Sequence, residues 1–92
     1  MYRKRVDDNH ATMVLALRDA GFTVHDMSRC GYGVPDLIIC RAGHCEWLEV
    51  KASAKSALTV YERSFFDYCP GGAPILAWTP QLVIAEFERR NQ

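Results

Sequence analysis

A nearly unbroken apolar run of strand length, residues 34–40, is followed by a second strand-like segment, residues 45–51, with Ala42-Gly43 at the centre of the gap between them. Two segments of this length that flank a tight turn are typical of a β-hairpin. If Ala42 and Gly43 form a two-residue turn, paired positions sum to 85 and Asp36 faces Glu49 across the hairpin. A type I′ turn would require Ala42 to take a positive φ. A four-residue loop keeps this pairing, whereas a three-residue loop shifts it.

The two carboxylates of this hairpin are candidate ligands for a divalent cation. Like charges that face each other on a sheet are destabilising, and a divalent cation between Asp36 and Glu49 would remove the penalty. Mg²⁺ binds oxygen ligands, commonly one or two carboxylates with waters and a substrate phosphate, and the backbone carbonyl of Val50 is a further candidate ligand. Lys51 lies two residues beyond Glu49 and therefore on the same face. The alternative is that Asp36 ends a loop and that Glu49 and Lys51 lie on a solvent-facing strand edge.

This pattern predicts hydrolysis of a phosphodiester bond. A cation lowers the pKa of a bound water and polarises the phosphoryl oxygen. The ammonium of Lys51 can orient that water and balance the charge that develops.

The rest of the sequence predicts a single domain, residues 1–92, with the order helix, three strands, helix, strand, helix. Thr59 and Glu62 form a capping box for the second helix, and Thr79 followed by Pro80 begins the last one. Asp7 or Asp8 caps the first. The predicted ranges are a helix to residue 20, strands over 22–27, 34–40 and 45–51, a helix over 58–68, a strand over 74–78 and a helix from residue 79 onward.

The chain has 11 Lys and Arg and 11 Asp and Glu, so the bulk positive charge of a strong nucleic-acid binder is missing. Binding to DNA must then use local basic groups. No apolar stretch of about 18 residues and no signal peptide are found, which predicts a soluble intracellular protein without a membrane partner. The candidate substrate-binding residues are Arg3, Lys4, Arg5, Lys55, Glu62 and Arg63.

Four cysteines could form two disulfides, but nothing else in the sequence indicates secretion, so reduced thiols are expected. A zinc site is the alternative. Its spacing lacks the paired C-x2-C knuckles of structural zinc modules. The four cysteines are Cys30, Cys40, Cys45 and Cys69, and the alternative zinc ligands are Cys40, His44, Cys45 and Cys69.

Residues 33–39, Gly-Val-Pro-Asp-Leu-Ile-Ile, and residues 47–51, Trp-Leu-Glu-Val-Lys, resemble the PD-(D/E)XK nuclease signature. The chain is similar, from Arg5 through the last helix, to the stand-alone VRR-NUC domains of bacteriophages. The resemblance implies a restriction-endonuclease-like α/β fold, with a small mixed sheet flanked by helices. It also implies that Asp36 and Glu49 bind Mg²⁺ or Mn²⁺ and that Lys51 is the catalytic lysine.

Two positions depart from that family pattern. Glu62 stands where the second helix usually has Gln, and it either serves the capping box alone or adds a third carboxylate near the metal. His10 follows Asn9 where the family usually has Glu. His10 either replaces that ligand or has no role at the site, and Asp7 or Asp8 is a further alternative ligand.

Together these features predict a metal-dependent endonuclease that acts on branched DNA, without a small-molecule cofactor. The resemblance suggests a Holliday-junction resolvase of phage origin, working in the host cytoplasm. A symmetric junction needs two cuts and the domain has one site, which implies a homodimer. The alternatives are a less selective nuclease for flaps or single strands and a non-catalytic DNA-binding module. Tyr32 is interpreted as a turn residue, with stacking on an unpaired base as the alternative.

Overall fold

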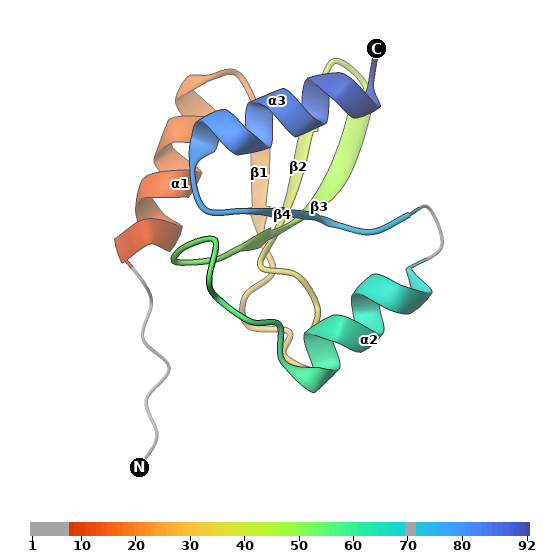
Figure 1. Ribbon diagram of the computed structural model, residues 1–92. Helices are drawn as coiled ribbons and strands as arrows, with labels where there is room; N and C mark the ends of the chain where they lie inside the picture. The colour runs from red at the N-terminus through yellow and green to blue at the C-terminus, as the bar shows by residue number, and fades with distance from the viewer. Residues whose placement is uncertain (1–7, 70–71) are drawn as a thin grey trace.

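The computed structural model describes residues 8–69 and 72–92, and its elements follow the predicted order (Figure 1). Strands β1, β2 and β3 are antiparallel neighbours, and β4 lies parallel to β3 at the sheet edge, so the sheet is mixed. The α/β prediction is confirmed. The elements are α1 (Asp8–Asp19), β1 (Thr23–Asp26), β2 (Leu37–Arg41), β3 (His44–Val50), α2 (Val60–Tyr68), β4 (Ile75–Ala77) and α3 (Pro80–Arg90).

The hairpin of β2 and β3 has the predicted register. Arg41 pairs with His44 next to the turn, and the ladder continues to the pair Leu37 and Leu48. Both turn residues are in the left-handed region, Ala42 at φ 53° and Gly43 at φ 83°. A type I′ turn requires this conformation at both positions, and its right-handed twist matches that of the strands it joins.

The start of β2 differs from the prediction of a strand over residues 34–40. The strand begins at Leu37, because Pro35 has no N–H to donate to a ladder and Asp36 forms a bend. Asp36 and Glu49 therefore lie one position beyond the last ladder pair. Their closeness depends on side-chain contacts rather than on strand pairing.

The expectation that all four cysteines are reduced is wrong for two of them. Cys40 and Cys45 form a disulfide, whereas Cys30 and Cys69 are free. The two bonded residues pair across the hairpin with their Cα atoms 4.1 Å apart. Antiparallel pairs that do not exchange backbone hydrogen bonds come this close, and their side chains leave the same face of the sheet.

The hydrophobic core lies on one face of the sheet, under α1 and α3, which contact each other and the strands. Alternation along the strands places Leu37, Ile39 and Leu48 in this core. Ile38 and Trp47, which pair with each other across the hairpin, belong to the opposite face and are only half-buried. The core residues are Met13, Leu17, Phe22, Val24, Leu37, Ile39, Leu48, Ile75, Ala77, Val83 and Phe87.

Helix α2 stands apart from α1 and α3 in Figure 1. None of its residues is buried, and it reaches the opposite face of the sheet through an edge-to-face contact of Phe65 with Trp47, with ring centroids 5.3 Å apart. The fold thus separates a core face from a second face that α2 partly covers. Within the described ranges, no helix combines the length and apolar character that a membrane crossing requires.

Candidate active site

Asp36 is anchored at the entrance to β2 by both its backbone and its side chain. Its carbonyl accepts a hydrogen bond from the N–H of Met27 at 2.7 Å. Its Oδ2 accepts one from the N–H of Val50 at 3.1 Å. The carboxylate is therefore fixed against the end of β3, next to Glu49.

Glu49 is the only charged residue that is buried in the described part of the chain, with 4% of its surface exposed. Burial, the negative charge of Asp36 and a hydrogen bond with Glu62 raise the pKa of Glu49 to about 9, against a smaller opposing effect of Lys51. In the absence of metal, Glu49 is therefore mostly protonated at neutral pH. A buried carboxyl group with a strongly raised pKa beside a second carboxylate is a typical candidate for a functional site.

Lys51 directly follows β3, and its N–H donates to the carbonyl of Ala77 at 2.9 Å. Its ammonium lies 2.8 Å from Oε1 of Glu62 and 3.7 Å from Oε2 of Glu49. The side chain is 13% exposed. The structure therefore brings together the three residues that the sequence singled out, with Lys51 beside the carboxylates.

Glu62 connects α2 to this cluster, and its place as a third carboxylate near a metal stays a prediction. It forms the predicted capping box with Thr59, accepting the Thr59 N–H at 2.8 Å and donating its own N–H to the Thr59 hydroxyl at 3.1 Å. Burial raises the pKa of Glu62, but the hydrogen bonds from Lys51 and the Thr59 N–H outweigh it, and the pKa is lowered. Glu62 is thus a third acidic residue at the site and the direct partner of Lys51.

Two residues that position the site were not among the predicted site residues. Asn9 on α1 donates from Nδ2 to the carbonyls of Lys51 at 2.8 Å and Trp78 at 3.3 Å, which ties α1 to the ends of β3 and β4. Gly33 packs directly on the start of α2, where an added Cβ would lie 2.2 Å from the Tyr61 carbonyl carbon. An asparagine near a helix start and a glycine before Pro-Asp are weak sequence signals, because neither pattern specifies a distant partner.

The remaining predicted residues lie away from the cluster or outside the described residues. His10 contacts Asp26, with Nε2 at 3.2 Å from Oδ2, and its role as a metal ligand stays a prediction. Lys55 lies in the exposed loop before α2. Arg63 is exposed on α2 and forms an ion pair of 3.4 Å with Asp67. Arg3, Lys4, Arg5 and Asp7 fall outside the described residues, as does the side chain of Asp8.

The donor set suits a hard divalent cation. No group of three or more His, Cys, Asp or Glu side chains within residues 8–69 and 72–92 forms a ready metal site. Asp36 and Glu49 nevertheless supply the one or two carboxylates that Mg²⁺ combines with waters and phosphate oxygens. Burial and the negative charge of Asp36 raise the pKa of Glu49. A cation between the two carboxyl groups would offset both effects and stabilise the ionised form of Glu49. Oxygen ligands favour Mg²⁺ or Mn²⁺ over a thiolate-bound metal.

The chain was compared with protein-family models, with curated proteins and with solved structures, and none of these matches it.

Proposed function

We propose that this protein is a Mg²⁺- or Mn²⁺-dependent DNA endonuclease with a restriction-endonuclease-like fold. The observation that carries the proposal is the buried Glu49 beside Asp36, with the Lys51 ammonium 3.7 Å from its carboxyl oxygen. Neither folding nor solubility benefits from two acidic groups held together next to a poorly exposed lysine. Cleavage of a phosphodiester, by contrast, uses all three groups.

In the proposed reaction, water adds to phosphorus and one backbone P–O bond breaks, which leaves a phosphate monoester and a hydroxyl group. Asp36 and Glu49 would hold the cation, which when bound supplies Lewis-acid activation of the phosphoryl group and of a water. Lys51 orients that water and offsets the negative charge that develops on the phosphoryl oxygens. Glu62 keeps the ammonium of Lys51 aimed into the site.

The substrate that fits this proposal is branched DNA, and the sequence resemblance favours a four-way junction. A single site per chain means that symmetric cutting of such a junction takes a homodimer. Flaps or single strands are the substrates of the alternative, less selective nuclease. A non-catalytic DNA-binding module is the alternative outside the enzymes.

The direct test is cleavage of labelled four-way junctions, flaps, single strands and linear duplexes with Mg²⁺, Mn²⁺ or chelator. Wild type should cut the branched substrates with metal only. Asp36→Asn, Glu49→Gln and Lys51→Ala should each lose at least about a hundredfold in rate, the scale of one lost electrostatic group.

Glu88→Gln is a matched control, because this carboxylate is exposed on α3 and its partner is Arg41. It should cleave like wild type. Robust cleavage by any of the three site variants would refute the assignment of the site. Folded wild type that binds DNA without cutting any substrate would identify the non-catalytic module instead.

A further inference from the structure

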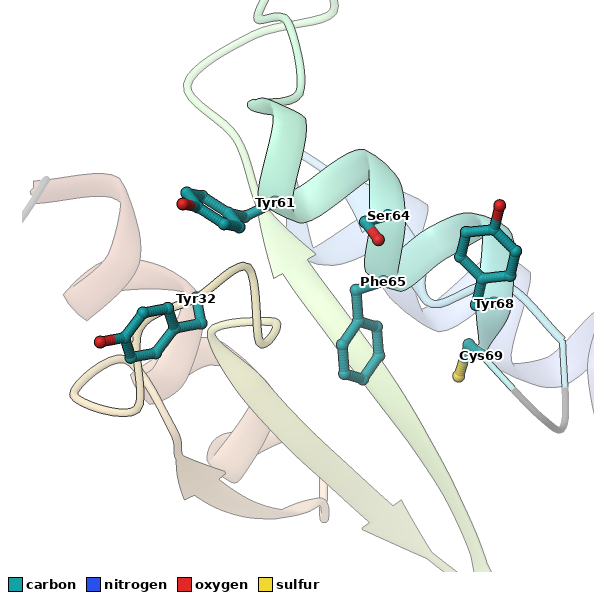
Figure 2. Close-up of a pocket in the computed structure, with 6 residues that line it drawn as sticks. All are labelled: Tyr32, Tyr61, Ser64, Phe65, Tyr68 and Cys69. Atoms are coloured by element: carbon teal, nitrogen blue, oxygen red, sulfur yellow. The ribbon is translucent and has the colours of Figure 1, made fainter.

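An aromatic pocket lies beside the proposed site, between the loop that precedes β2 and helix α2. Figure 2 shows Tyr32 from this loop next to Tyr61 at the start of α2, with Phe65 and Tyr68 further along the helix. The pocket has a volume of ≈ 300 Å³, at the lower end of the range of about 300–1,000 Å³ usual for ligand pockets. Its lining residues are Tyr32, Tyr61, Ser64, Phe65, Tyr68 and Cys69.

The tyrosines of this pocket are far more exposed than the fold requires. Tyr32 is 85% exposed, Tyr68 81% and Tyr61 63%. The hydrophobic core lies on the other face of the sheet and takes nothing from α2. Packing among the described residues therefore does not explain why these large rings face outward together.

Local contacts hold the rings of Tyr32, Tyr61 and Phe65 in place. Tyr32 has φ 54°, a conformation that is uncommon for residues other than glycine, asparagine and aspartate. Its ring meets that of Tyr61 edge to face, with centroids 6.2 Å apart. The close approach of Gly33 to the Tyr61 backbone fixes the loop against α2, and Phe65 is fixed by Trp47. The pocket is thus formed before any ligand arrives.

We propose that this pocket binds an unpaired nucleobase of the DNA strand that the neighbouring site cuts, an inference that rests on the proposed function. Its described lining residues carry rings, hydroxyls and a thiol but no charge, which suits a flat neutral base rather than a phosphate. Stacking on aromatic side chains accepts any base. Tyr61 directly precedes Glu62, the partner of Lys51, so the pocket and the catalytic groups share the first turn of α2.

The substrate preferred by this site is therefore a branched DNA with an unpaired nucleotide beside the branch. The test compares such a DNA, with 2-aminopurine at the unpaired position, with its fully paired form, using Ca²⁺ in place of Mg²⁺ to follow binding. Wild type should bind the unpaired form at least about fivefold more tightly, and stacking should quench the 2-aminopurine fluorescence. Tyr61→Ala should lose both effects, and Tyr61→Phe should keep both because the ring remains.

Leu15→Ala is the control, since this residue is 68% exposed on α1, outside the pocket; it should change neither effect. Equal affinity for both DNAs, or a Tyr61→Ala variant with unchanged quenching, overturns the proposal. It is also overturned if Tyr61→Ala turns a dimer into a monomer in sedimentation while the preference for the unpaired base persists, because the pocket would then bind a second copy. Cleavage in Mg²⁺ is scored separately, so that an inactive protein refutes the nuclease and leaves the binding test of the pocket intact.

Discussion

Replacing Glu49 by Gln should stabilise the metal-free protein, and the gain should depend on pH. The pKa of Glu49 is raised from 4.5 to about 9 in the folded protein, so ionisation favours the unfolded chain. Below pH 4.5 the carboxyl is protonated in both the folded and the unfolded state, and its contribution to stability is fully present. As pH rises from 4.5 toward 9, the unfolded chain ionises and the folded protein does not, so the free energy of unfolding falls by about 1.4 kcal/mol per pH unit. At pH 7 the full loss would be about 3 kcal/mol, and partial access of water reduces it to about 2. A neutral amide at position 49 avoids this loss.

The assay is urea unfolding followed by tryptophan fluorescence at pH 4, 5.5 and 7, with chelator present. Glu49→Gln should match wild type near pH 4 and exceed it by about 2 kcal/mol at pH 7, which corresponds to about 10 °C in melting temperature. Glu88→Gln, at an exposed carboxylate, should show no such pH-dependent gain. A loss of stability in Glu49→Gln at pH 7, or a gain of the same size at pH 4 and pH 7, would show that the carboxyl is not buried against Asp36.

Further predictions concern the metal, the loop before β2 and the path of DNA. If Glu49 binds Mg²⁺ as proposed, the cation has to displace the proton of this carboxyl group. The affinity for Mg²⁺ should then rise by up to about tenfold per pH unit between pH 6 and 8, and calorimetry in two buffers should detect proton release; a pH-independent affinity would argue against Glu49 as a ligand. Gly33→Ala should destabilise by about 2 kcal/mol or more, because φ is 80° and the new Cβ meets the Tyr61 backbone; unchanged stability in urea would contradict this packing. Lys55→Ala and Arg63→Ala should each lower the log–log slope of DNA affinity against salt by about one if they contact phosphate; slopes equal to wild type would place the DNA elsewhere.

The sequence predicted the features that depend on residues close together in the chain. The register of the hairpin followed from two turn residues and the two-residue period of strands, and the capping box of Thr59 and Glu62 followed from spacing alone. The ion pair of Glu62 with Lys51 could not be predicted in this way, because it depends on how a loop returns α2 to the sheet. The pairing of Asp36 with Glu49 was predicted by extending the ladder of the hairpin to Asp36. In the structure, the Asp36 carboxylate is held there by a hydrogen bond that it accepts from the N–H of Val50.

The disulfide and the half-buried Trp47 show a second limit of prediction from the sequence. The expectation of reduced thiols relied on where the protein is made, whereas the bond between Cys40 and Cys45 follows from their direct pairing across the hairpin. Trp47 is only half-buried, because the helix that covers its face of the sheet, α2, has no buried residue, and the position of that helix is a long-range property.

The lack of buried residues in α2 has a dynamic consequence for Lys51. Elements with few buried contacts open locally at free energies well below that of global unfolding. When α2 lifts from the sheet, Lys51 loses its ion pair with Glu62, and its ammonium is no longer held beside Glu49. Amide hydrogen exchange should therefore be faster in α2 than in β2 and β3. The position of the Lys51 ammonium would then depend on how often this surface helix opens.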